Sequence, residues 1–89
     1  MNKARRKDLA DIIEKLEALD ALREEIREEL AAVRDEEQEA LENMPEGLQY
    51  SERGERMREY VDTMESVTGE LDLIDIESLM DQLREIMDG

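Results

Sequence analysis

The 89-residue sequence contains no cysteine, histidine, tryptophan or phenylalanine, and its only aromatic side chains are those of Tyr50 and Tyr60. Without cysteine the chain has no disulfide, and without cysteine or histidine it lacks the usual ligands of zinc. Its serine and threonine hydroxyls have no imidazole to activate them, and a thin helical fold offers no cleft to hold two carboxylates at a fixed separation. We expect no enzymatic activity, no metal site and no cofactor.

Long apolar runs are also absent. No segment approaches the length of a signal-peptide core or a membrane span, so we expect no membrane association. A chain of this size buries only about two thirds of its unfolded surface, which leaves a thin margin of stability. Because disulfides and zinc are excluded, self-association is the remaining route to a stable fold, and we expect a homodimer or a higher oligomer.

Charge of one sign dominates the composition, with 27 acidic and 12 basic residues and a net charge of −15. Four of the basic residues, Lys3, Arg5, Arg6 and Lys7, precede the first acidic one, so the chain from Asp8 onward carries a net charge of −19. A field of that sign disfavours nucleic acid and favours a basic protein surface. Cations oppose the dipole at a helix N-terminus, so residues 1–7 are expected to form a frayed basic arm.

Apolar residues recur at alternating steps of three and four in the first half of the chain. This heptad spacing predicts a long helix over residues 8–43 with a seam that meets another helix. Two charged residues, Arg23 and Glu37, occupy seam positions. The other seam positions are Leu9, Ile12, Leu16, Leu19, Ile26, Leu30, Val33, Ala40 and Met44.

A turn is predicted over residues 44–51, where Pro45 disfavours helical geometry at Met44 and Gly47 permits the reversal. Ser51 provides a cap for a second helix over residues 52–88, although Gly54 stands where a full capping box has glutamate. The apolar stripe of this helix changes phase, which predicts a kink or a break near residues 69–75. Similar helix lengths favour the kinked helix, whereas a capping role for Asp72 or Asp75 favours a break.

The expected fold is all-α, a single domain over residues 1–89 formed by a coiled-coil-like antiparallel helical hairpin. Folding the chain back about the turn brings together residues whose numbers sum to about 95, within one helical turn. This register pairs Glu37 with Arg58 and Arg23 with Asp72. Ile13, Leu22 and Leu41 flank the seam of the first helix, which is wider than one partner helix covers, so two hairpins are expected to join in a bundle.

The segment from Asp35 to Glu55 resembles a pattern found in small uncharacterised acidic proteins of bacteriophages and bacterial mobile elements. In these proteins a long acidic helix ends in an Asn-x-Pro-Glu-x-Leu-Gln turn, followed by Ser-Glu-Arg and a second helix. The stretch from Val67 to Ile76 departs from the regular second helix of that pattern. The resemblance implies a viral or prophage setting, and hence the cytoplasm of a bacterial host, but it assigns no functional residue. The matching positions are Asn43, Pro45, Glu46, Leu48, Gln49, Ser51, Glu52 and Arg53.

Three functions are compatible with these features. The first is a non-enzymatic phage-type protein that binds a basic surface of a host protein and inhibits a defence or nucleic-acid enzyme by DNA mimicry. The second is a structural or assembly role as a helical oligomer. The third, which the acidic body disfavours, is regulation through the basic arm on nucleic acid. The residues expected to contact a partner are Glu28, Asp35, Glu39, Glu42, Tyr50, Glu55, Glu59, Asp62 and Glu65.

Overall fold

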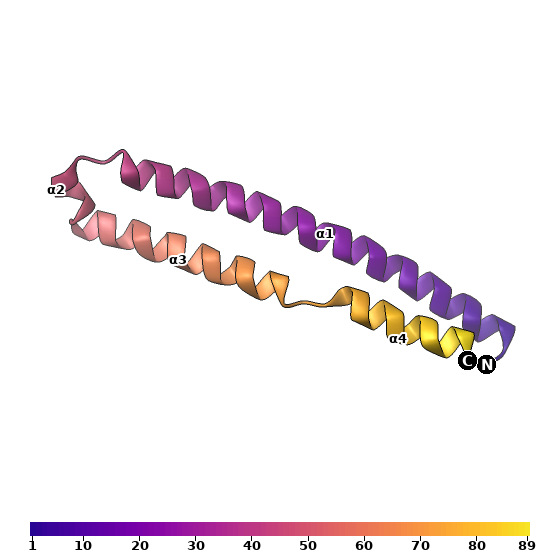
Figure 1. Ribbon diagram of the computed structural model, residues 1–89. Coiled ribbons are helices and arrows are strands. Elements are labelled where there is room, and N and C mark those ends of the chain that lie inside the picture. The colour runs from indigo at the N-terminus through magenta and orange to yellow at the C-terminus, as the bar shows by residue number, and fades with distance from the viewer. The chain divides into compact units, whose positions relative to one another are not determined.

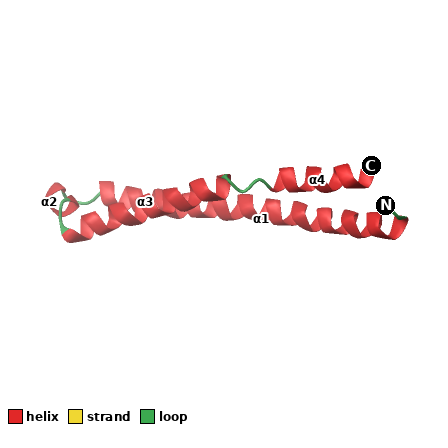
Figure 2. Ribbon diagram, turned by 90° about the horizontal axis from the view of Figure 1, so that it is seen from below, coloured by secondary structure: helices red, strands yellow, loops and turns green.

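The computed structural model describes all residues from Met1 to Gly89 and contains four helices and no strand (Figure 1). The prediction of an all-α protein is confirmed. Loops and turns lie around α2, between α3 and α4, and at the chain termini (Figure 2). The helices are α1 (Lys3–Glu42), α2 (Glu46–Gln49), α3 (Glu52–Asp72) and α4 (Ile76–Asp88).

Helix α1 begins at Lys3, five residues before the predicted start at Asp8. Asn2 explains the difference, because its side-chain Oδ1 accepts a hydrogen bond from the backbone N–H of Arg5 at 2.9 Å. An asparagine at this position satisfies one of the unpaired N–H groups of the first turn. The basic residues 3–7 are therefore helical, and the expectation of a frayed arm was wrong.

The turn after α1 matches the prediction from Pro45, which directly precedes the single-turn helix α2. The side-chain amide of Gln49 donates hydrogen bonds to the backbone carbonyls of Met44 at 2.9 Å and of Glu42 at 3.3 Å. Carbonyl groups at the end of a helix lack partners within it. Gln49 thus supplies a cap for the C-terminus of α1.

Helix α3 begins after Ser51, whose hydroxyl accepts a hydrogen bond from the backbone N–H of Gly54 at 3.3 Å. The helix ends at Asp72, and α4 starts at Ile76 after Asp75 accepts a hydrogen bond from the N–H of Ser78 at 3.0 Å. The break falls within the predicted interval 69–75. The continuous kinked helix that helix length favoured was wrong, because Asp75 caps a new helix.

The chain divides into two compact units, which both include part of α1. Unit 1 comprises Met1–Glu25 and Ile74–Gly89, and unit 2 comprises Ile26–Leu73. The core of unit 1 consists of Ile13 from α1 and Ile76 and Met80 from α4, with Leu16, Leu83 and Met87 packed against them. The buried apolar side chains of unit 2 are Leu41, Met57 and Val61. The single domain and the antiparallel hairpin over the whole chain stay predictions.

The residues of α1 that face the other helices differ from the predicted seam. At every second seam position, the residue that faces inward is the next one along the chain. Ile13 and Leu41, expected to flank the seam, are buried, whereas Ile12 and Val33, expected on it, are about half exposed. The same displacement occurs in unit 2, where Arg27 and Arg34 face α3 in place of Ile26 and Val33. Arg34 forms an ion pair with Glu65, and Arg27 forms one with Asp72. The row that contains Ile13 is apolar only there and at Leu41, and it carries Asp20, Arg27 and Arg34 between them, so its apolar residues alone do not identify it as the inner face.

Candidate partner-binding surface

All nine residues expected to contact a partner lie in unit 2, and every one of them is exposed. Four are on the second part of α1 and four are on α3, and Tyr50 follows directly after α2. Unit 2 contains 15 acidic and five basic side chains, so two thirds of the net charge of the chain belongs to these 48 residues. The structure therefore gathers the candidate residues in the more acidic unit.

The carboxylates of α1 occupy one flank of that helix. At 3.6 residues per turn, Glu28, Asp35 and Glu39 share a side, together with Glu42. On α3 only Glu65 lies toward this flank, because Glu55, Glu59 and Asp62 fall opposite the buried residues Met57 and Val61. The candidates form two surfaces rather than a single row. We call the side of unit 2 formed by Glu28, Asp35, Glu39, Glu42 and Glu65 the carboxylate flank.

Arg34 forms hydrogen bonds with two residues of the carboxylate flank. Its guanidinium Nε donates a hydrogen bond to Oε1 of Glu65 at 2.9 Å and its NH1 group donates to Oδ1 of Asp35 at 3.0 Å. These two bonds, the one to Glu65 foremost, raise the pKa of Arg34 above its ordinary value. A raised pKa in the folded state adds stability that is lost only as the pH rises through it. Arg34 is therefore a cation throughout the neutral range, and it partly neutralises two candidate residues.

Tyr50 is 72% exposed. The guanidinium carbon of Arg58 lies 5.4 Å from the centre of its ring, within the range of a cation–π contact. Arg58 forms no ion pair with Glu37, so that predicted pairing was wrong. Sequence reasoning did not identify Arg58 as a neighbour of Tyr50, because only the path of the turn brings the two side chains together.

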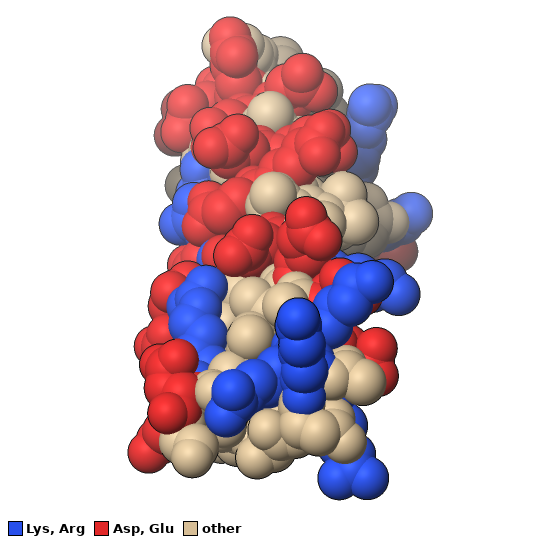
Figure 3. Space-filling view, turned by 90° about the vertical axis from the view of Figure 1, so that its right-hand side faces the viewer, with Lys and Arg blue, Asp and Glu red and all other residues tan.

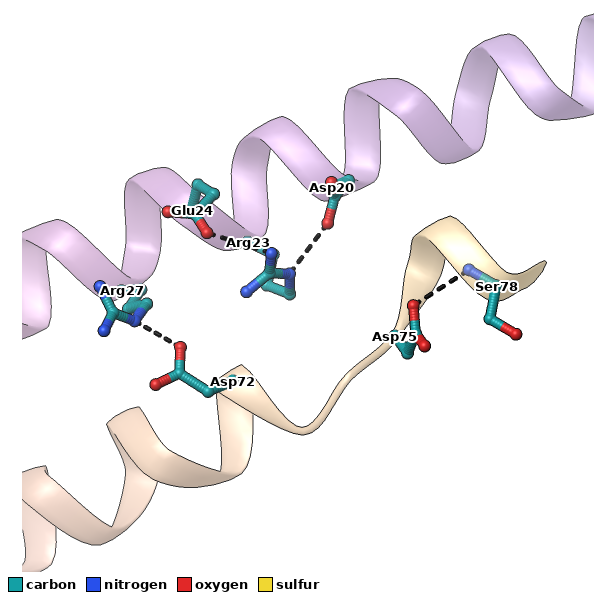
Figure 4. A network of polar contacts seen from close by, with 7 residues as sticks. All are labelled: Asp20, Arg23, Glu24, Arg27, Asp72, Asp75 and Ser78. Atoms are coloured by element: carbon teal, nitrogen blue, oxygen red, sulfur yellow. Dashed lines mark hydrogen bonds and ion pairs between the residues drawn. The ribbon is translucent and has the colours of Figure 1, made fainter. Parts of the chain in front are cut away.

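Asp72 forms its ion pair with Arg27, one helical turn from the predicted partner Arg23 (Figure 4). Arg23 belongs to unit 1 and Asp72 to unit 2, so the pairing of Arg23 with Asp72 stays a prediction. Hydrogen bonding to Asp20 at 2.9 Å is the main cause of the raised pKa of Arg23, and Glu24 contributes as well. Arg27 and Arg34 thus form ion pairs between α1 and α3, and neither pair was predicted from the sequence.

The opposite side of unit 2 is apolar. Because Arg34 pairs with Glu65 on one side of the α1 and α3 contact, helical periodicity places Val33 and Val67 on the other. An open groove of about 600 Å³ lies on this side, lined by Glu37, Tyr60, Thr63 and Met64. We define the apolar flank of unit 2 as Ile26 and Val33 of α1 with Tyr60 and Val67 of α3, all of them at least 40% exposed.

Basic side chains gather where α1 begins, at the end of the molecule nearest the viewer in Figure 3. Lys3, Arg5, Arg6 and Lys7 are exposed there, and none of the ion pairs in the structure involves them. No cluster of three carboxylates is arranged to hold a metal ion. None of the helices combines the length and the apolar character needed to cross a bilayer.

Comparison of the chain with protein-family models, curated proteins and solved structures gives no match. Functional conclusions therefore depend on the surfaces described above.

Proposed function

We propose that the protein is a non-enzymatic binding protein that captures a basic surface of a host protein with the carboxylate flank of unit 2. The main support is the gathering of Glu28, Asp35, Glu39 and Glu42 on one side of α1, in a unit where acidic residues outnumber basic ones three to one. Such a surface attracts a basic partner over distances comparable to the Debye length, about 8 Å at physiological salt. The resemblance of the turn region supports a phage or mobile-element setting for this activity and, with it, the cytoplasm of a bacterial host.

In its specific form, the proposal is that the target is a defence or nucleic-acid enzyme and that the carboxylates occupy its phosphate-binding surface. Asp35, Glu39 and Glu42 follow one another at about 6 and 4.5 Å along the helix axis, a somewhat wider spacing than the roughly 3.4 Å between phosphates along one strand of duplex DNA. Tyr50, exposed in the turn between α2 and α3, adds an apolar contact with a polar tip, as is common at protein interfaces.

A charge-matched pair of variants tests this function. The flank variant carries Glu28→Gln, Asp35→Asn, Glu39→Gln and Glu42→Gln, and the control carries four equivalent changes at exposed positions of unit 1, Asp11→Asn, Glu14→Gln, Glu85→Gln and Asp88→Asn. The immobilised chain is used to capture proteins from a bacterial lysate at low salt. We expect only the flank variant to lose the captured protein, and we expect salt and duplex DNA to release it from the wild type. Equal capture by both variants and the wild type would contradict the proposal.

The second candidate function is assembly, in which the chain acts as a helical oligomer without an inhibitory role. The observation that favours it is the apolar flank of unit 2, since exposed apolar surface on a helix commonly marks a contact with another helix. In this alternative the chain folds back as an antiparallel hairpin and two hairpins associate in a bundle. Binding that is unaffected by salt and by the flank substitutions favours assembly over capture.

A further inference from the structure

Methionine is the only sulfur-containing residue of the chain, and two of the six methionines, Met80 and Met87, lie on α4. Because cysteine is absent, a peroxide finds no thiolate to attack first, and the thioethers are its sulfur targets. Met80 and Met87 are seven residues apart, so they share one side of the helix. This is the side that packs on α1, so the two sulfur atoms belong to the contact between α4 and α1.

The two methionines provide half of the apolar side chains with which α4 packs in unit 1. Met80 is 3% exposed and forms the core with Ile13 and Ile76. Met87 and Leu83 pack against this core from the same helix. Every member of the cluster is apolar, and the chain has no buried polar or charged residue. The attachment of α4 thus depends strongly on two side chains that oxidation makes polar.

Solvent reaches the two methionines unequally. Met87 is partly exposed in the last turn of α4, whereas Met80 is almost completely covered near the middle of the helix. The ends of a helix also open more often than its centre. An oxidant dissolved in water therefore meets Met87 before it meets Met80.

Oxidation of a thioether by hydrogen peroxide makes an apolar side chain polar. A lone pair of the sulfur attacks one peroxide oxygen, the O–O bond breaks, and the products are the sulfoxide and water. The sulfoxide oxygen accepts hydrogen bonds, and an acceptor that is buried without a donor is costly. The cluster around Met80 contains no side-chain donor, so its sulfoxide is accommodated better in water than in the core. Oxidation therefore favours the separation of α4 from α1.

We propose that Met87 and Met80 form a redox-sensitive contact, which releases α4 from α1 in two steps. Peroxide first oxidises Met87, which loosens the end of α4 and admits water to Met80, and oxidation of Met80 then detaches the helix. An isolated helix of 13 residues is marginal in water, so the released segment unfolds. Methionine sulfoxide reductases regenerate the thioethers, which makes the release reversible. The carboxylate flank belongs to unit 2, and this inference does not depend on capture of a host protein.

Peptide mass spectrometry of the chain after treatment with hydrogen peroxide tests the order of the two steps. We expect Met87 to gain an oxygen atom at least fivefold faster than Met80. Met87→Leu keeps an apolar side chain of similar volume without sulfur, so it should slow the oxidation of Met80 at least fivefold. Met64→Leu is the matched control, because Met64 is partly exposed in unit 2, and it should leave the rate at Met80 unchanged. Equal rates at Met80 in Met87→Leu and the wild type would overturn the proposal.

Hydrogen exchange tests whether oxidation releases α4. In the fully oxidised wild type, the backbone amides of α4 should exchange at least tenfold faster than in the reduced chain. The control carries Met80→Leu and Met87→Leu, and circular dichroism checks that it has the helix content of the wild type before treatment. It gains the same sulfoxides elsewhere in the chain but should keep the slow exchange of α4. Slow exchange of α4 in the oxidised wild type, or equally fast exchange in the treated control, would overturn the proposal.

Enzymatic reduction of the oxidised chain tests whether the contact is reversible. Methionine sulfoxide reductases for both sulfoxide epimers are added to the oxidised wild type, and mass spectrometry follows the loss of the added oxygen atoms. We expect the exchange rates of α4 to return to within about twofold of those in the untreated chain. Exchange that stays fast after the oxygen atoms have been removed would overturn the reversible contact. Capture of a partner by the carboxylate flank is measured independently, so either proposal can fail alone.

Discussion

Gly54 lies directly against the backbone of Gln49. A Cβ atom built on Gly54 would be 2.6 Å from the carbonyl carbon of Gln49 and 2.9 Å from the carbonyl oxygen of Leu48. Real Cβ atoms essentially never approach other atoms below 3.0 Å. The glycine that departs from a full capping box at this position is therefore required by the close passage of α2 beside the first turn of α3.

Substitution of Gly54 by alanine should destabilise the protein by about 1–3 kcal/mol, because the obstructing atoms belong to backbone that cannot move aside cheaply. Gly69→Ala is the matched control, since Gly69 is also in α3 and has nothing within 4 Å of its Cβ position. Alanine there should stabilise by about 0.5–1 kcal/mol. Urea unfolding of the two variants checks both signs, and a stabilised Gly54→Ala would contradict the observed path of the turn.

The ion pair between Arg34 and Glu65 should show a coupling free energy of about 0.3–1 kcal/mol in a double-mutant cycle. The magnitude is modest because both side chains are partly exposed, at 30% and 50%. Charge reversal of Arg34 or Glu65 alone should lower the unfolding free energy, and reversal of both should restore part of the loss. Glu37 with Arg58 is the control cycle and should show no coupling. Coupling at the control pair alone would contradict the observed pairing of α1 with α3 and support the register predicted from the sequence.

Asp75→Ala should destabilise α4 by about 1 kcal/mol, because the N–H of Ser78 loses its acceptor. Asp75→Asn, which keeps an oxygen at the cap, should have a smaller effect. Limited proteolysis offers a direct measurement, since Leu73 beside the cap is 82% exposed and is the expected site of cleavage. Equal cleavage rates for the wild type and both variants would show that the cap does not hold the start of α4.

Turn chemistry was the most predictable part of the fold. Pro45, Ser51 and Asp75 have local effects that depend on neighbouring backbone alone, so the turn after α1, the start of α3 and a possible cap for α4 could be recognised in the sequence. The start of α1 was predicted too late in the chain, because the charges of residues 3–7 disfavour a helix start there. The side chain of Asn2, which caps the helix, offsets this effect and was not considered.

The inner face of α1 could not be chosen from the sequence. The row of residues seven apart that starts at Ile12 is apolar throughout, whereas the row that contains Ile13 carries Asp20, Arg27 and Arg34. Only the packing of Ile76 and Met80 shows that Ile13 is inside. The same one-residue difference concealed the roles of Arg27 and Arg34. For the candidate surface, exposure of the nine residues was predictable from their polarity. Their division between two sides of unit 2 depends on which faces of α1 and α3 meet, and that required the structure.

Helix α1 runs through both units without interruption, and this continuity has a consequence for the way the protein opens. Propagating an existing helix is much easier than nucleating a new one. When the contacts of one unit are lost, the half of α1 held in the other unit remains a template from which the lost half regrows. Backbone amides of α1 should therefore exchange with solvent more slowly than those of α4, whose 13 residues must form a new helix after each opening. We therefore expect α1 to stay helical during local unfolding events in which the shorter helices that pack on it unfold and refold.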